Sequence, residues 1–151
     1  MFLYCFTVMG LDSTIWGPPM WFFLHTSAMT YPLHPNAVTK KKYYDFFQNL
    51  PLFIPIEPMA SNFSKLLDEY PITPYLDNRE SLTRWTWFIH NKINQQLEKP
   101  VISLNDFYVK YYDAYKPKKE KMIEYYKIRE KIVYVFFLCL LLFAIYYLYD
   151  K

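Results

Sequence analysis

The chain has 151 residues, enough for one compact domain and one additional element. It contains only two glycines, Gly10 and Gly17, whereas P-loops and dinucleotide-binding fingerprints need glycine for close approach of the backbone to phosphate. The net charge of +3 is too small to indicate nucleic acid, so no nucleic-acid partner is expected. Any nucleotide cofactor must therefore be held by side chains on helices.

Cysteine is scarce in this sequence. Only Cys5 and Cys139 occur, one near the N-terminus and one in the most apolar stretch of the chain. Two cysteines placed so far apart do not form a disulfide framework, and the sequence contains no C-x-x-C motif. So few cysteines are typical of a protein in a reducing compartment. No metal site is predicted.

Prolines divide the first 115 residues into segments whose apolar residues recur at helical spacing, and no segment alternates over a useful length as a β-strand would. The short, proline-marked connections are typical of a helical bundle. We therefore predict an all-α fold, a small bundle of four to five helices over residues 12–115, preceded by an apolar segment over residues 1–11.

Capping residues predict where these helices begin. Ser13 precedes a helix over residues 16–31. Pro18 and Pro19 are expected in its first turn, because proline is tolerated only there. Thr39 is the expected cap of a second helix. The other helices are predicted from about Pro58 to Glu69, from a capping box at Asp77–Glu80 to about Leu97, and from Ser103 through Phe107, Tyr111 and Tyr115.

The strongest physical signal lies at the C-terminal end. Every residue from Ile132 to Tyr149 is aliphatic, aromatic, Cys or Ala. As a helix this stretch is roughly 27 Å long, enough for a thin hydrocarbon core. Tyr146, Tyr147 and Tyr149 stand at its far end, where an aromatic belt would lie. The alternative is a buried core helix, but such a helix normally keeps a polar stripe. We predict a transmembrane helix over residues 132–149, with the lipid bilayer as partner.

A basic juxtamembrane helix is predicted over residues 116–131. Only Asp150 and Lys151 follow the apolar stretch, so the excess of Lys and Arg lies before it. The positive-inside rule then predicts a single-pass membrane protein whose N-terminal domain is cytoplasmic. The basic segment suits contact with anionic lipid head groups, and it equally suits a solvated helix face, since glutamates are interspersed.

The first candidate site segment combines indole rings with an imidazole. On a helix Trp21 and His25 are i, i+4 neighbours, and Trp16 and Gly17 lie beside Trp21. An alternative interpretation is plain packing, because a lone histidine on an apolar helix is usually a core residue and clustered tryptophans usually pack together.

The second segment places Trp87, His90, Asn91 and Asn94 on one helix face. Such a face is awkward as core, because each buried amide must find hydrogen-bond partners. A heterocycle with ring nitrogens, a ribose and a pyrophosphate would supply them. The opposite face is an ordinary core stripe, formed by Leu82, Trp85, Ile89, Ile93 and Leu97.

The two segments contain the patterns W-G-x-x-x-W-x-x-L-H-T-x-A-x-x-Y-P and H-N-x-(V/I)-N-x-x-L-x-K-P. In this order and spacing they resemble the FAD-binding signature of the Erv/ALR family of FAD-linked sulfhydryl oxidases, of the type found in large DNA viruses. The resemblance covers roughly residues 12–115 and implies a helical bundle that encloses FAD. It implies that one side of the cofactor is lined by Trp16, Gly17, Trp21, His25 and Tyr31. The other side would be lined by residues of the segment that also contains Trp87, namely His90, Asn91, Ile93, Asn94 and Lys99. The family's later Arg-Trp pair would fall on Lys110 and Tyr111.

The sequence departs from the family where its chemistry resides. The family reaction needs a C-x-x-C beside the flavin, one thiolate to attack the ring and a second to resolve the adduct. The resemblance puts these positions at Ile56 and Met59, and a further frequent cysteine at Leu104. Isoleucine has no lone pair and methionine is a thioether, so neither serves as a redox nucleophile. The replacements are apolar and similar in bulk, so the packing can survive.

The leading hypothesis is therefore a membrane-anchored degenerate oxidase with a structural or binding role, catalytically inactive, in which FAD is retained or lost. By analogy with family members in large DNA viruses, its expected location is a virion inner membrane or the underside of a capsid, with viral structural proteins as partners. Family members also dimerise through early helices, so a homodimer through residues 43–53 is a further expectation.

Two alternatives stay open. One is an FAD-dependent thiol oxidase that passes electrons to oxygen using thiols from a partner, because Cys139 is expected in lipid and Cys5 lacks a second thiol. The other is a bare helical membrane adaptor without cofactor, in which Trp87 and His90 are ordinary core residues.

Overall fold

The computed structural model describes residues 11–150, and all regular structure in that range is helical. The elements are α2 (Ser13–Met29), α3 (Ala37–Asn49), η1 (Leu50–Phe53), α4 (Glu57–Glu69), η2 (Thr73–Tyr75), α5 (Arg79–Gln96), α6 (Leu104–Tyr115) and α7 (Lys118–Tyr149). The predicted all-α fold with a long apolar C-terminal helix is confirmed. Cys5 and all but the last residue of the expected N-terminal segment 1–11 lie outside the described residues.

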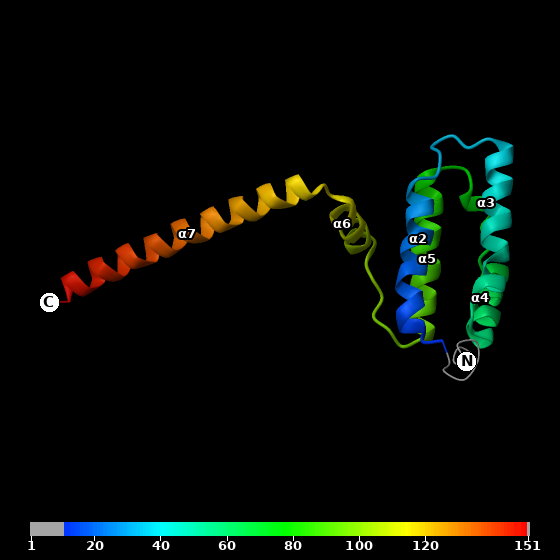
Figure 1. The fold of residues 1–151 in the computed structure, drawn as a ribbon, viewed down its shortest axis with the longest axis horizontal. Helices are drawn as coiled ribbons and strands as arrows, with labels where there is room; N and C mark the ends of the chain where they lie inside the picture. The colour runs from blue at the N-terminus through cyan, green and yellow to red at the C-terminus, as the bar shows by residue number, and fades with distance from the viewer. Residues whose placement is uncertain (1–10, 151) are drawn as a thin grey trace, which may run out of the picture. The chain divides into compact units, whose positions relative to one another are not determined.

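The chain forms two compact units, one ending at Leu104 and the other beginning at Asn105. The first unit contains the helices from α2 to α5. Figure 1 shows α2 beside α5, with α3 and α4 next to this pair. The finer division into 12–115, 116–131 and 132–149 stays a prediction, and α7 runs without interruption across residue 131.

The core of the first unit confirms most of the predicted stripe on α5. Leu82, Trp85 and Ile89 are buried there against side chains of α2, α3 and α4, and Ile93 is partly buried beside them. The assignment of Leu97 to this stripe was wrong, because it is the C-cap and 39% of it is exposed. The opposite face of α5 is thereby left to the polar residues discussed below.

Helix α2 begins earlier than predicted. Its N-cap is Asp12, whose carboxylate accepts a hydrogen bond from the Thr14 backbone N–H at 2.8 Å. Hydrogen bonds from the backbone and the side chain of Thr14 lower the pKa of Asp12. Because the helix starts at Ser13, Pro18 and Pro19 lie in its second turn, and the first-turn expectation was wrong. Each proline leaves the carbonyl four residues earlier without its helical donor, at exposed residues that water can reach.

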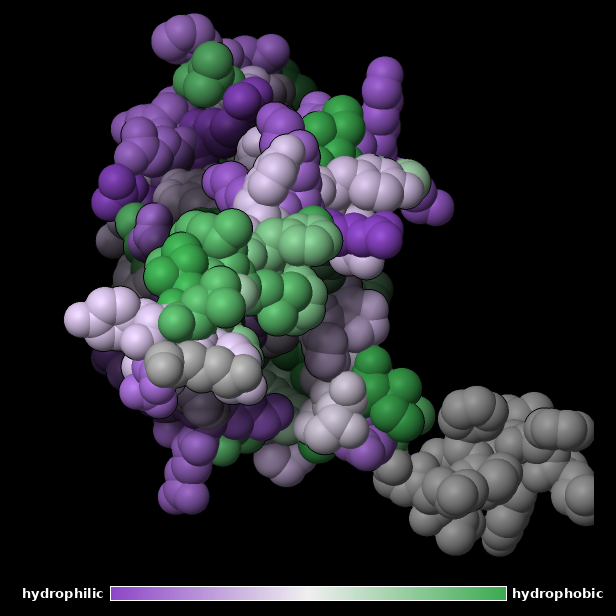
Figure 2. Space-filling view, turned by 90° about the vertical axis from the view of Figure 1, so that its left-hand side faces the viewer, coloured by the Kyte–Doolittle hydropathy of each residue, from purple (hydrophilic) through white to green (hydrophobic). Residues whose placement is uncertain are grey.

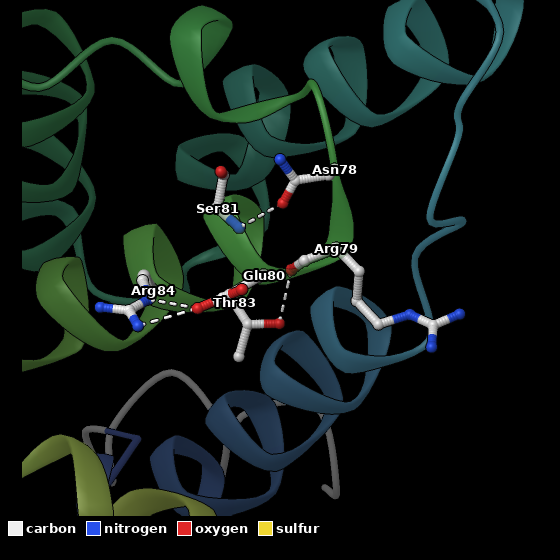
Figure 3. Close-up of polar contacts among 6 residues, drawn as sticks. All are labelled: Asn78, Arg79, Glu80, Ser81, Thr83 and Arg84. Carbon is white, nitrogen blue, oxygen red and sulfur yellow. Dashed lines mark hydrogen bonds and ion pairs between the residues drawn. The ribbon is translucent and has the colours of Figure 1, made fainter.

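Asparagine caps α3 and α5, where other residues were predicted. Asn36, not Thr39, caps α3, and Thr39 instead donates its backbone N–H to the Asn36 side chain at 2.8 Å. Asn78, not Asp77, caps α5 and accepts from the Ser81 N–H at 2.9 Å, as Figure 3 shows. Both asparagines have the extended backbone of an N-cap, so their amide oxygens reach the third helical residue.

The C-terminal end of α5 is a Schellman motif. The N–H of Lys99 donates to the carbonyl of Asn94 at 2.8 Å, and the N–H of Glu98 donates to that of Gln95 at 3.2 Å. Glu98 has a φ of 54°, a left-handed conformation that such motifs usually assign to glycine. The motif turns the chain sharply and fixes where Lys99 begins the segment that leads to α6.

The second unit contains most of α6 and all of α7, which meet at Lys116 and Pro117. Pro117 is the N-cap of α7. The ammonium group of Lys116 lies 5.4 Å from the centre of the Tyr112 ring and forms an ion pair with Glu124. The hydrogen bond that Lys116 donates to Glu124 raises the pKa of Lys116. These contacts hold the end of α6 against the first turns of α7.

Helix α7 has 32 residues, and none of them is buried. By length and composition it is the one helix in the described part of the chain that is apolar enough to cross a membrane. Figure 2 shows apolar side chains gathered in a green patch on the face turned to the viewer. Every side chain from Ile132 to Tyr149 is exposed, an arrangement that water alone disfavours.

Candidate functional site

The facing surfaces of α2 and α5 bring the predicted aromatic and imidazole groups together. Trp21 stacks flat on His90, with ring centres 4.0 Å apart and planes 3° from parallel. It also stacks on His25, at 5.4 Å and 23°. Nε2 of His25 and Nδ1 of His90 are 2.8 Å apart and share a hydrogen bond. The two patterns, about 65 residues apart in sequence, thus form one cluster.

A threonine extends this cluster into the core. His25 is fully buried, and its Nδ1 lies 3.3 Å from the hydroxyl oxygen of Thr86. Thr86 is itself buried and donates to the carbonyl of Thr83 at 2.9 Å. Sequence analysis did not identify Thr86, although its place one helical turn before His90 was a usable signal.

The start of α2 combines an unsatisfied donor with open space. The indole N–H of Trp16 is buried and has no hydrogen-bond acceptor among the described residues. A Cβ built on Gly17 meets no atom of the described residues within 4 Å. A buried donor without a partner is costly, and an added group that accepted the hydrogen bond would remove that cost.

Trp87 and Asn91 have partners within the protein. The indole N–H of Trp87 and the side-chain amide of Asn91 both donate to the carbonyl of Ile102 at 2.8 Å. The side-chain oxygen of Asn91, Oδ1, in turn accepts a hydrogen bond from the Ile102 backbone N–H at 3.0 Å. This clamp satisfies polar groups for which sequence analysis proposed a cofactor as partner. It fixes the segment after α5, and cofactor contacts for both residues stay predictions.

The other predicted lining residues of this unit occupy varied positions. Tyr31 is buried, and its hydroxyl donates to the carbonyl of Leu76 at 3.0 Å. Burial, followed by the neighbouring Tyr43 and Asp77, raises the pKa of Tyr31. Asn94 is buried and Ile93 partly buried, whereas Lys99 is exposed. Among these four residues Lys99 is the one whose side chain is most free to reach a solvent-facing phosphate.

Lys110 and Tyr111 belong to the second unit, on α6. Lys110 is exposed, whereas Tyr111 is buried, and burial raises the pKa of its hydroxyl well above the usual range. Their predicted role beside a cofactor stays a prediction.

The predicted thiol positions lie at the start of α4. Ile56 is the N-cap of this helix, and the N–H of Met59 donates to the Ile56 carbonyl at 3.0 Å. Phe63 follows Met59 by one turn on the same face and lies 6.3 Å from Trp21, ring centre to ring centre. This face of α4 therefore turns toward the cluster on α2 and α5 but supplies only apolar groups to it.

These helices form a bundle with an aromatic and imidazole site between α2 and α5, and comparison with known proteins identifies the family. The sequence profile described as Erv1 / Alr family matches residues 18–133, most of the chain. The chain therefore belongs to the Erv1/Alr family.

Relatives and solved structures agree with this assignment. A probable FAD-linked sulfhydryl oxidase of Acanthamoeba polyphaga mimivirus is 35% identical over 89 residues, which are 58% of this chain and 62% of that protein. An FAD-linked sulfhydryl oxidase of African swine fever virus is 30% identical over 112 residues, 74% of this chain and 89% of that protein. The crystal structure of the FAD-binding domain of Erv1 from Saccharomyces cerevisiae superimposes with a TM-score of 0.64 at 29% identity, covering 71% of this chain and all of that one.

The chain covers some relatives only in part. It spans 62% of the mimivirus protein and 48% of the mitochondrial FAD-linked sulfhydryl oxidase of Schizosaccharomyces pombe. The activities in these names belong to those whole proteins.

Proposed function

We propose that this protein is a membrane-anchored member of the Erv1/Alr family that keeps a flavin site but has lost the disulfide relay, and that it acts as a structural or binding protein rather than an oxidase. One contrast carries the proposal. The cluster of Trp21, His25 and His90 is fully assembled, yet the sequence contains no C-x-x-C.

Several features of the site fit FAD. Relatives of this chain are named FAD-linked, and a solved relative is an FAD-binding domain. The buried indole N–H of Trp16 lacks an acceptor among the described residues, and the space beside Gly17 is open. Trp21 and His90 offer a flat aromatic surface, and Lys99 offers a cation for a phosphate. Bound FAD would accept an electron pair from a dithiol and pass it to oxygen.

The reason for proposing inactivity is chemical. The relay requires two thiols, one that forms an adduct and one that resolves it as a disulfide. The residues at the predicted thiol positions, Ile56 and Met59 at the start of α4, can do neither. Cys139 is in the middle of α7, where a bilayer would surround it.

The exposed apolar length of α7 supports the membrane anchor. Eighteen consecutive exposed apolar residues are stabilised by transfer into hydrocarbon, which a helix of this length can span. The excess of Lys and Arg over residues 116–131 favours a cytoplasmic first unit. Because relatives of this chain include viral proteins, we extend the proposal to a virion membrane or capsid, with viral structural proteins or a second copy of this chain as partners.

One preparation tests these points. The full chain is expressed, its membrane fraction is washed with alkaline carbonate, and the detergent-solubilised protein is examined by visible absorption and for oxygen consumption with dithiothreitol. We expect resistance to the wash, a flavin spectrum and no turnover above free flavin. Turnover by the wild-type chain would overturn the degenerate assignment, and release by the wash would overturn the anchor.

The matched variants restore or mimic the thiol pair. The double variant Ile56→Cys/Met59→Cys should gain dithiothreitol oxidation, because it supplies the attacking and the resolving sulfur at the start of α4. The control Ile56→Ser/Met59→Ser introduces side chains of nearly the same volume as cysteine but without sulfur, and it should stay inactive. A colourless wild-type protein would exclude both the retained flavin and the oxidase alternative. The remaining interpretation would be a helical adaptor.

A further inference from the structure

We propose that α7 selects a bilayer with a thin hydrocarbon core, close to the roughly 27 Å of an endoplasmic-reticulum type of membrane rather than the roughly 32–33 Å of a sterol-rich plasma membrane. This preference rests on the proposed membrane anchor, and it names the kind of bilayer that the anchor fits. It depends on α7 alone and holds whether or not the first unit binds flavin.

The apolar stretch of α7 ends abruptly on both sides. Lys131 directly precedes it, and Asp150, the C-cap of the helix, directly follows it. The eighteen residues between them, 132–149, cover about 27 Å at the helical rise of about 1.5 Å per residue. Together with Lys131, Arg129 and Glu130 make three of the four residues before the stretch charged. The length that hydrocarbon can surround without taking up charge is therefore sharply limited.

A hydrogen bond marks the first boundary. The Tyr134 hydroxyl donates to the carboxylate of Glu130, one turn earlier, at 3.4 Å. Helical side chains lean toward the N-terminus, and here this lean carries the polar end of Tyr134 out of the apolar stretch. Tyrosine at the edge of a hydrocarbon core lies in this way, with its ring in the apolar layer and its hydroxyl among the head groups. A deeper position would take the carboxylate of Glu130 into hydrocarbon.

The same lean makes the second boundary strict. At the C-terminal end of a helix a side chain leans back toward the middle of the helix, so the short Asp150 side chain does not reach outward as a lysine would. Drawing this end into the bilayer would therefore place a carboxylate in hydrocarbon. Neither end of the stretch can be extended at small cost.

The length of the stretch then decides between bilayers. A helix that is too long for a bilayer can tilt, but tilting shortens the projected span and does not help a helix that is too short. In a core of roughly 32–33 Å the stretch is about 5 Å too short. Either the bilayer thins around it or Arg129, Glu130 and Lys131 enter the hydrocarbon, and both changes are unfavourable. In a core of about 27 Å neither is needed.

A bilayer, rather than a second protein, fits the pattern of exposure. No residue of α7 is buried, and the side chains from 132 to 149 are exposed on every face of the helix. One partner helix would cover a single face and leave the others in water, whereas hydrocarbon covers all of them.

The test uses the full chain, synthesised in a cell-free system that contains preformed vesicles. The vesicles consist of monounsaturated phosphatidylcholines whose acyl chains lengthen from fourteen to twenty-two carbons along the series. They are washed with alkaline carbonate and floated, and the inserted fraction of the protein is measured. We expect this fraction to be largest in the thinner half of the series and at least about fivefold smaller at twenty-two carbons, because the cost of mismatch grows with each ångström.

Two variants separate helix length from hydrophobicity. Four leucines inserted between Leu141 and Leu142 lengthen the stretch by about 6 Å and should move the optimum to thicker vesicles. The matched control Cys139→Leu/Ala144→Leu adds apolar surface at unchanged length and should leave the optimum where it is. Both changes lie in α7, so tryptophan fluorescence, which reports on the first unit, should be the same in all three proteins.

The outcomes distinguish the preference from the anchor on which it rests. An inserted fraction that does not depend on acyl-chain length would overturn the preference and leave the anchor standing. An optimum that the four-leucine insertion does not move would do the same. Release from every vesicle by the carbonate wash would overturn the anchor and the preference together, and cross-linking of the released protein would then show whether a second copy covers α7.

Discussion

The facing surfaces of α2 and α5 and the start of α4 border the same cluster, but they differ in chemistry. The first surface carries an indole, two imidazoles and a threonine hydroxyl joined by hydrogen bonds and stacking. The second carries Phe63, whose ring centre lies 6.3 Å from that of Trp21, and the apolar residues Met59 and Ile56 at earlier positions of the same segment.

Under the proposed loss of the thiol pair, the difference indicates which parts of a family site can change without loss of the fold. His25 is fully buried and Tyr31 hydrogen-bonds across the bundle, so these groups are also part of the core. Removing them costs stability whether or not a cofactor binds. A thiol at residue 56 or 59 would serve only the chemistry, and an apolar side chain of similar volume replaces it at little cost.

The largest expected effect is on the α2 side of this comparison. Trp21→Ala should lower the free energy of unfolding by about 3 kcal/mol, because the indole covers both imidazoles and contacts Phe63. Met59→Ala at the start of α4 should cost only about 1 kcal/mol, because Met59 is half-buried and joins no hydrogen-bonded cluster through its side chain.

Urea titration of the detergent-solubilised full chain provides the measurement. All four tryptophans precede residue 105, so their fluorescence reports on the first unit alone. Equal losses in the two variants would remove the contrast between the two surfaces.

How much of this could be predicted depends on the range of the interaction. Helix existence and the stripe of Leu82, Trp85 and Ile89 follow from local periodicity, and they were predicted. The exact N-cap residues were not predicted. Asp12 and Asn36 lie close to Ser and Thr residues that could also cap a helix, and which residue becomes the cap depends on backbone angles that the sequence does not show.

The site shows the same limit. The pairing of His25 with His90 spans 65 residues and was not predicted, because the family resemblance implied only that the two residues line different sides of a cofactor. The clamp on Ile102 was not foreseen, because its partner is a backbone group that a sequence pattern does not mark. A buried amide indicates that some partner exists, but not whether a ligand or the main chain provides it.

A second prediction concerns that clamp. Asn91→Ala should cost about 1.5 kcal/mol and should remove the hydrogen-exchange protection of the Ile102 amide, because its N–H loses the side-chain acceptor. The Ile102 carbonyl keeps the bond from Trp87. Asn62→Ala, at an exposed position on α4, is the matched control and should change stability by less than about 0.5 kcal/mol. Retained protection in Asn91→Ala would show that the segment after α5 is held by other contacts.

The smallest expected effect distinguishes the flavin-free chain from the chain with FAD bound. Glycine inside a helix costs roughly 0.5–1 kcal/mol relative to alanine, and a Cβ at Gly17 meets no atom of the described part of the chain within 4 Å. Gly17→Ala should therefore stabilise the flavin-free chain by about that amount in the same urea titration. With saturating FAD the gain should shrink or reverse, since a methyl group would project into the space proposed for the cofactor. An equal gain with and without FAD would mean that the open space beside α2 is not part of a flavin site, and the contrast between the two surfaces would then reflect packing alone.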